Sequence, residues 1–163
     1  MLRIAGNGAE KSGQIFGPDC QSTAVAAHAY GSTCFAMSDV QTDGSTRRRQ
    51  VMGDEFVDRA LADADDFTRP LQDFITDHAW GAVWCRDGMD LKTRSLITVA
   101  MLTALGRHDE LRGHVRGALN NGASTGEIQE VLLHAAVYCG VPLAAEAFRA
   151  ARPVIQAHRA GCV

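Results

Sequence analysis

The side chains of Glu110 and His114 are four residues apart, in a segment whose apolar residues recur at helical spacing. On a helix, residues at that separation share a face. A carboxylate beside an imidazole can accept the ring proton, fix the tautomer and raise the basicity of the ring, which suits general acid–base catalysis. The same spacing also occurs in a surface ion pair or a half-buried structural histidine, so the pattern alone leaves both interpretations open.

Three further features could line a binding site. Arg94 lies near the start of the preceding apolar segment, where a guanidinium could bind a carboxylate through two hydrogen bonds or pair with a local acid. His134 and Tyr138 are four residues apart, and so are Trp80 and Trp84. The first pair could line a pocket or pack in an interface, and the second could wall a pocket or belong to the core.

Helical patterns between residues 90 and 142 place most of these candidates. Asp90 is a good N-cap for the first helix. Residues 96–105 of that helix are apolar almost all round, which predicts a helix buried on every side. A second helix is predicted over about residues 108–120, with Gly122 following it.

The third helix of this stretch opens with Ser124 and Glu127, a pair typical of a capping box. Gly140 and Pro142 are predicted to close it. Further helices are predicted over residues 54–61, 68–84 and 143–158. No convincing strand pattern and no solenoid repeat is present, so the sequence predicts an all-α fold of about six helices.

Residues 1–46 differ from the rest of the chain. They are rich in Gly, Ser, Thr and Ala, and no helical or alternating pattern lasts more than a few residues. We expect an irregular or mobile N-terminal arm there, followed by a helical domain over residues 47–163. The basic triplet at residues 47–49 is interpreted as the solvated start of that domain.

The composition of the 163-residue chain fits one globular domain. Its net charge of −3 argues against a nucleic-acid-binding protein, and no apolar run is long enough to span a membrane. The N-terminus has no secretory-signal pattern. The five cysteines of the chain are widely spread and form no C-x-x-C pair. This favours free thiols in a reducing cytoplasm over a disulfide framework or a metal site.

Five blocks occur in order along the chain: MGDEFVDRAL, AWGAVW, LKTRSLITVAMLTALGR, ELRGHVRGALNNGAS and EIQEVLLHAAVYCGVPLA. Together they resemble the carboxymuconolactone decarboxylase family over about residues 47–155. The resemblance implies a helical bundle like that of alkylhydroperoxidase D, assembled as a trimer or hexamer. The apolar helix at residues 96–105 and the alanine-rich face at 144–151 also predict contact between subunits of a homo-oligomer.

The activity that the resemblance implies is decarboxylation of 4-carboxymuconolactone to 3-oxoadipate enol-lactone and CO2, in protocatechuate degradation by the β-ketoadipate pathway. The unsaturated lactone is its own electron sink, so no cofactor is expected. Under this hypothesis His114 donates a proton and Glu110 orients it. The expected contacts to the small-molecule substrate come from Arg94, Trp84, His134 and Tyr138.

Two other functions remain open on the sequence. Relatives similar to alkylhydroperoxidase D carry C-x-x-C-x-x-x-H, and this chain has Arg107 and Glu110 at the cysteine positions, His114 at the histidine, and Ser95 where those relatives have a glutamate. A thiol-dependent peroxidase or disulfide reductase needs two sulfurs close together, so this alternative is disfavoured. A non-catalytic oligomeric binding protein is the other alternative.

Overall fold

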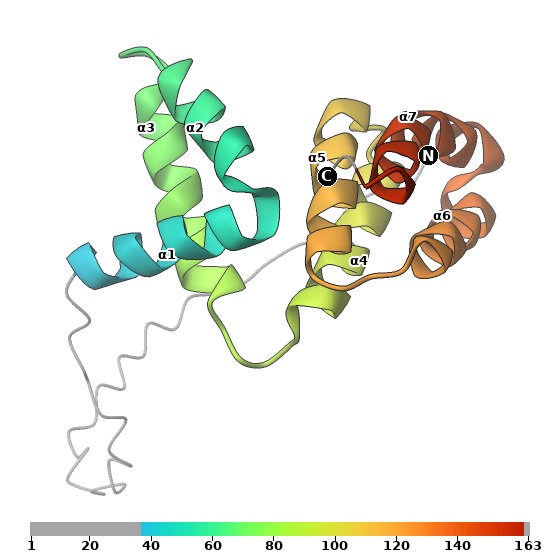
Figure 1. Cartoon of the computed structure of the whole chain (residues 1–163), viewed down its shortest axis with the longest axis horizontal. Helices are drawn as coiled ribbons and strands as arrows, with labels where there is room; N and C mark the ends of the chain where they lie inside the picture. The colour runs from blue at the N-terminus through green and yellow to red at the C-terminus, as the bar shows by residue number, and fades with distance from the viewer. Residues whose placement is uncertain (1–36, 162–163) are drawn as a thin grey trace, which may run out of the picture. The chain divides into compact units, whose positions relative to one another are not determined.

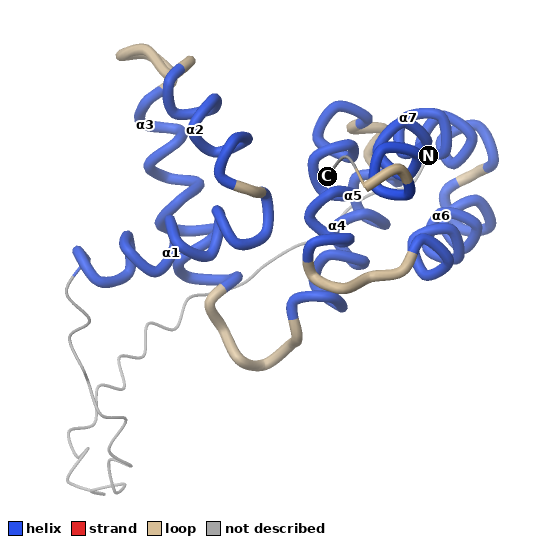
Figure 2. The backbone as a smooth tube through the Cα atoms, viewed as in Figure 1, coloured by secondary structure: helices blue, strands red, loops and turns tan. Residues whose placement is uncertain are grey.

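A computed structural model describes residues 37–161, with side chains from Asp43 onward, and all of these residues fall within one unit at residues 34–163. The described backbone consists of helices joined by loops and contains no strand (Figure 2). The predicted all-α fold is therefore confirmed. None of the described helices is both long enough and apolar enough to cross a bilayer.

The described chain forms seven α-helices and one π-helix (Figure 1). They are α1 (Met37–Met52), α2 (Asp54–Ala62), α3 (Arg69–Phe74), the π-helix η1 (Ile75–Trp84), α4 (Leu91–Ala104), α5 (His108–Asn120), α6 (Thr125–Cys139) and α7 (Val141–Arg159). The single helix predicted over residues 68–84 corresponds to α3 followed directly by η1. Pro142 belongs to the first turn of α7, where a backbone N–H would have no helical partner, so proline is tolerated. Gly140 alone therefore ends α6.

Helix α1 was missed by sequence reasoning, and the expected arm boundary at residue 46 falls inside it. A β-carbon on Gly44 would lie 2.4 Å from the carbonyl oxygen of Thr76 and 2.8 Å from the backbone nitrogen of Gly81. Glycine therefore permits α1 to touch the backbone of η1. Because this packing, and not the propensity of a Gly- and Ser-containing segment, supports the helix, no amphipathic pattern announced it. Residues 1–36 of the expected arm lie outside the described residues.

Two hydrophobic clusters hold these helices together. The larger joins α4, α5, α6 and α7 through side chains that include Val99, Leu111, Val115, Ile128 and Leu132. The smaller joins α1, α2 and η1 through Val51, Met52, Val57, Trp80 and Trp84. Each fully buried aliphatic side chain of this size contributes about 1.5–3 kcal/mol of transfer free energy. Helix α5 contacts both groups of helices, since it packs against α4 and α7 and also against α1.

The single chain covers only part of α4, so the expected burial on every side, which involves a subunit contact, stays a prediction. Its inward residues Ser95, Val99 and Thr103 are buried, whereas Met101 and Leu105 are 59% and 71% exposed. The alanine-rich face of α7, expected at a subunit contact, is instead buried inside the chain by its own neighbouring helices. An apolar helix face needs cover, but the sequence alone does not say whether the same chain provides it.

The predicted helix caps are confirmed. The side chain of Asp90 accepts a hydrogen bond from the backbone N–H of Thr93 at 2.8 Å. The backbone N–H of Ser124 donates to Glu127 Oε2 at 2.8 Å, and the backbone N–H of Glu127 donates to Ser124 Oγ at 3.1 Å. These bonds satisfy the free amides at the first turns of α4 and α6.

Candidate active site

A cavity of about 350 Å³ lies among α1, α2, η1 and α5. Its polar and charged lining residues are Arg48, Asp109, Glu110 and His114, and the rest of its lining is apolar. The apolar lining residues are Met52, Phe56, Ile75, Ala79, Trp80, Trp84 and Gly113. A cavity with apolar walls and a few convergent polar groups is the usual form of a small-molecule site. Four of the residues singled out in the sequence therefore meet here: Glu110, His114, Trp80 and Trp84.

Helix α5 packs closely on α1 beside His114, at two glycines of α5. A β-carbon on Gly113 would lie 3.1 Å from Met52 Cε, and one on Gly117 would lie 3.1 Å from Val51 Cγ1. The small residues let α1 approach α5 closely. Asn120 secures the same contact further along, since its side-chain N–H donates to the carbonyl oxygen of Val51 at 2.9 Å.

The ring of His114 is half-buried and forms no hydrogen bond to any other described side chain or backbone group. Burial lowers the pKa of His114 below its usual value, and the negative charge of Glu110 only partly opposes that shift. A histidine in this state is neutral over a wider pH range than usual. Once protonated it is a stronger acid than free imidazole, and it has no protein partner to satisfy.

Glu110 differs from the sequence prediction in its partner. Its Oε1 accepts a hydrogen bond from Arg107 Nε at 3.2 Å and a second from Arg107 Nη2, so the carboxylate is held within its own helix turn. This pairing lowers the pKa of Glu110. No hydrogen bond joins it to His114 within the described residues; the two interact only through charge. The orienting role assigned to Glu110 remains a prediction.

Arg48 is a cavity residue that sequence reasoning missed. The triplet at residues 47–49 was expected to be solvated, but Arg48 is only 5% exposed. Its Nη2 donates to Gln72 Oε1 at 2.8 Å and its Nη1 donates to Thr76 Oγ1 at 3.3 Å. The sequence carries no apolar signal for it: positions 44, 48, 51 and 52 share a buried face of α1, but the first two are glycine and arginine.

The two tryptophans belong both to the core and to the cavity wall. Trp80 and Trp84 are 5% and 8% exposed, and their ring centroids are 4.8 Å apart. Arg94 lies against Trp84, with its guanidinium carbon 5.9 Å from the ring centroid, and its Nη2 donates to the carbonyl oxygen of Arg86 at 3.3 Å. Arg94 is thus next to a wall of the cavity without lining it.

His134 and Tyr138 lie in a different place. Their ring centroids are 4.7 Å apart, and both residues line an open groove of about 820 Å³ between α4 and α6. Tyr138 is 76% exposed, and the groove's other lining residues are mostly aliphatic. The structure therefore does not bring these two residues together with His114.

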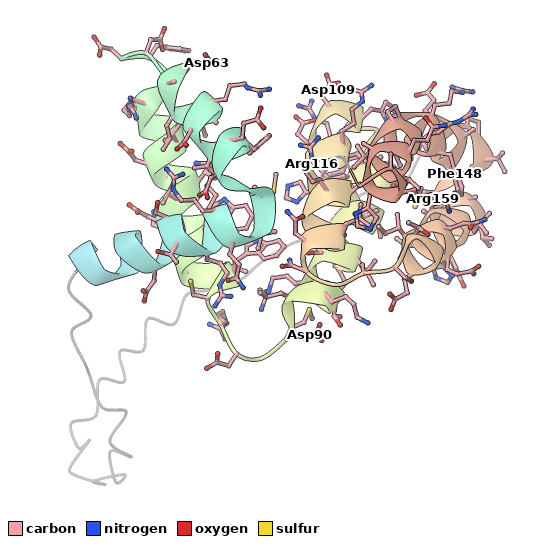
Figure 3. The ribbon with its side chains drawn as sticks, viewed as in Figure 1. Asp63, Asp90, Asp109, Arg116, Phe148 and Arg159 are labelled. Atoms are coloured by element: carbon pink, nitrogen blue, oxygen red, sulfur yellow. The ribbon has the colours of Figure 1, made fainter. Side chains whose placement is uncertain are left out.

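Asp109 and Glu110 line the cavity from the first turn of α5, where Figure 3 labels Asp109. Asp109 forms an ion pair with Arg112, as Glu110 does with Arg107. No cysteine lines this cavity, and the free thiols within the described part are Cys85 and Cys139. Across residues 37–161, no three His, Cys, Asp or Glu side chains gather as ligands for a metal ion.

Comparison with known proteins identifies the family. Residues 69–153 match the model of the carboxymuconolactone decarboxylase family. The chain is 43% identical over 122 residues to 4-carboxymuconolactone decarboxylase of Acinetobacter baylyi, an alignment that covers 74% of this chain and 91% of that protein. It is 50% identical over 105 residues to nitrosuccinic acid decarboxylase of Metarhizium robertsii, over 64% of this chain and 73% of that protein. The chain thus belongs to the carboxymuconolactone decarboxylase family.

Proposed function

We propose that this protein is a carboxy-lyase that converts 4-carboxymuconolactone to 3-oxoadipate enol-lactone and CO2 in the cavity between α1, η1 and α5. Family membership and the similarity to a named 4-carboxymuconolactone decarboxylase support the reaction. The observation that carries the site is the position of His114. It is a half-buried imidazole with no protein hydrogen-bond partner among the described residues, and it faces a cavity walled by two tryptophans.

The substrate dictates what the site must do. In 4-carboxymuconolactone, the ring carbon at the far end of the double bond from the lactone carbonyl carries both the departing carboxylate and a CH2–COO⁻ group. The bond from the ring carbon to the departing carboxylate breaks, and its electron pair moves through the ring double bond to the lactone carbonyl oxygen. A proton is then added to the ring carbon beside that carbonyl. Because the lactone itself accepts the electron pair, the protein has to bind, orient and protonate the substrate.

His114 is proposed as the donor of that proton. An imidazolium whose pKa burial has lowered gives up its proton readily, and the negative charges of a bound substrate favour its protonated form until transfer. Trp80 and Trp84 keep water away from the intermediate, which strengthens electrostatic interactions in the cavity. His114 then regains a proton from solvent, which balances the reaction.

The test is direct: purified protein is mixed with 4-carboxymuconolactone, and the absorbance of the conjugated lactone and the release of CO2 are followed. Loss of absorbance with stoichiometric CO2 is the expected result. No loss of absorbance would overturn this proposal and favour a non-catalytic binding protein. Consumption of a hydroperoxide with dithiothreitol would instead favour the peroxidase alternative.

Nitrosuccinate is the second candidate substrate, because the relative that acts on it is 50% identical to this chain. Its departing carboxylate is attached to the carbon bearing the nitro group. When that carbon–carbon bond breaks, the electron pair moves into the nitro group, and protonation of the resulting nitronate gives 3-nitropropanoate. The same assay run with both substrates decides between them through the ratio of kcat/KM values.

The proposal also covers the oligomeric state of the protein and the position of its reaction in a pathway. A homo-oligomer, trimer or hexamer, is supported by the exposed apolar groove between α4 and α6, which a second copy could cover. The enol-lactone product requires a hydrolase to open the ring, as in the protocatechuate branch of the β-ketoadipate pathway. Sedimentation of only a 17.5 kDa species would contradict the proposed oligomer.

A further inference from the structure

Arg48 is a buried cation whose protein partners are all neutral. Two of its N–H groups donate to Gln72 Oε1 and Thr76 Oγ1, and no ion pair joins it to a carboxylate of the described residues. A guanidinium has five N–H donors, so three remain for other acceptors. Burial lowers the pKa of Arg48, and the nearby positive charge of Arg49 lowers it further.

The acids that share the cavity do not pair with Arg48. Asp109 is paired with Arg112 and Glu110 with Arg107, each within the first turns of α5 or just before them. Taking a charge out of water is costly unless an opposite charge and hydrogen bonds replace the water. Arg48 faces the cavity in this state, so an anionic group in the cavity is the partner it lacks.

The substrates named for the two relatives share a structural unit. In 4-carboxymuconolactone the ring carbon bears a carboxylate and a CH2–COO⁻ group, and in nitrosuccinate the nitro-bearing carbon bears the same two groups. Both are therefore substituted succinates. In each, the carboxylate that leaves is on the carbon attached to the electron sink, and the carboxylate that stays is on the neighbouring CH2. The sinks, a lactone and a nitro group, have little else in common.

We propose that Arg48 binds the CH2-carboxylate that the substrate keeps, and that the site therefore selects succinates bearing an electron-accepting substituent on the carbon that loses CO2. This inference rests on the proposed function. A planar guanidinium can hold that carboxylate through two parallel hydrogen bonds. With one end of the substrate fixed at α1, the electron sink extends toward His114 on α5. The other polar residues of the cavity lining, Asp109 and Glu110, are held in ion pairs.

Arg94, the cation expected from the sequence to bind a carboxylate, is placed differently. Its guanidinium packs on Trp84 and donates to the carbonyl oxygen of Arg86, and it does not line the cavity. It supports the tryptophan wall from behind. Arg47, next to Arg48 in the sequence, donates to Gln50 and lines a separate small hollow, which makes it a matched control.

The experiment compares ligands that differ only in the carboxylate that stays. The probes are furan-2-acetate, which mimics the enol-lactone product, and 3-nitropropanoate, each with its methyl ester. Calorimetry measures their affinities for wild type, Arg48→Gln, Arg48→Lys and Arg47→Gln. Wild type and Arg47→Gln are expected to bind each acid roughly 10- to 100-fold more tightly than its ester, the range for a hydrogen bond to a charged group.

In Arg48→Gln the acid and its ester should bind with equal affinity, and Arg48→Lys should recover part of the difference. Circular dichroism confirms that each variant is folded, and the ester affinities show that its cavity is intact. An acid–ester difference that persists in Arg48→Gln would overturn the assignment, even if the protein decarboxylates its substrate. Conversely, an Arg48-dependent preference without turnover of either substrate would remove the proposed reaction and leave Arg48 as an anion-binding residue.

Discussion

The cavity around His114 and the groove between α4 and α6 differ in how far their polar side chains are buried. The cavity is smaller, about 350 Å³ against 820 Å³, yet it contains a buried arginine and a half-buried histidine. The groove has an exposed histidine and tyrosine on largely aliphatic walls. Desolvation increases the strength of electrostatic interactions, so the smaller site is the one suited to chemistry and the larger one to contact with an apolar surface.

The strongest test of this comparison replaces each of the two histidines with alanine in a separate variant. His114→Ala should lower kcat by about 10²-fold or more, the usual scale for loss of a general acid. His134→Ala should change kcat far less, because its ring lies in the groove. Steady-state kinetics on both folded variants checks this. A larger loss at His134 than at His114 would reverse the roles given to the two regions.

A charge placed in the groove should alter assembly before it alters the fold. Val137 lines the groove and is 79% exposed, so Val137→Asp costs little in the isolated chain but buries a carboxylate if a second copy covers the groove. Sedimentation should show the variant shifting toward the 17.5 kDa species. Phe67→Asp, at a residue that is 90% exposed and outside the groove, is the control. An unchanged oligomer in Val137→Asp would exclude the groove as the contact.

The half-buried His114 should also affect the free energy of unfolding. Folding lowers the pKa of His114 below the ordinary histidine value of about 6.5. As the pH falls below 6.5, the unfolded chain therefore binds a proton at this residue before the folded chain does. The free energy of unfolding should therefore decrease as pH falls below that point. Urea unfolding across pH 5–7 should show this slope in wild type and a shallower one in His114→Gln. An equal slope in both proteins would mean that another group is responsible.

The smallest expected effect concerns the two walls of the groove. Lys92 on α4 contacts Glu127 on α6 at 2.9 Å. The hydrogen bond from the Ser124 backbone, followed by this contact with Lys92, lowers the pKa of Glu127 to about 2. A lowered carboxyl pKa stabilises the fold above the ordinary value of 4.5, and that stabilisation is lost as pH falls from 4.5 toward 2. Glu127→Gln should unfold at a higher pH in an acid titration monitored by circular dichroism. A midpoint that does not move would show that the contact is energetically neutral.

The sequence alone determined the parts of this protein that depend on local bonds and on periodicity. Asp90, Ser124 and Glu127 cap their helices through backbone groups three residues away. The apolar residues of α4, α5 and α6 recur at helical spacing, which can be read from the sequence alone. It also placed Glu110 and His114 on one helix and indicated the family.

Tertiary structure decided the rest, because the deciding partners are far apart in the chain. Arg48 is buried by contacts with Gln72 and Thr76, which are 24 and 28 residues away, and α1 depends on a glycine fitting against η1. Likewise, only packing could separate His114 from His134, since both are histidines on apolar helix faces. A spacing pattern states which side chains share a face, whereas desolvation depends on what covers that face.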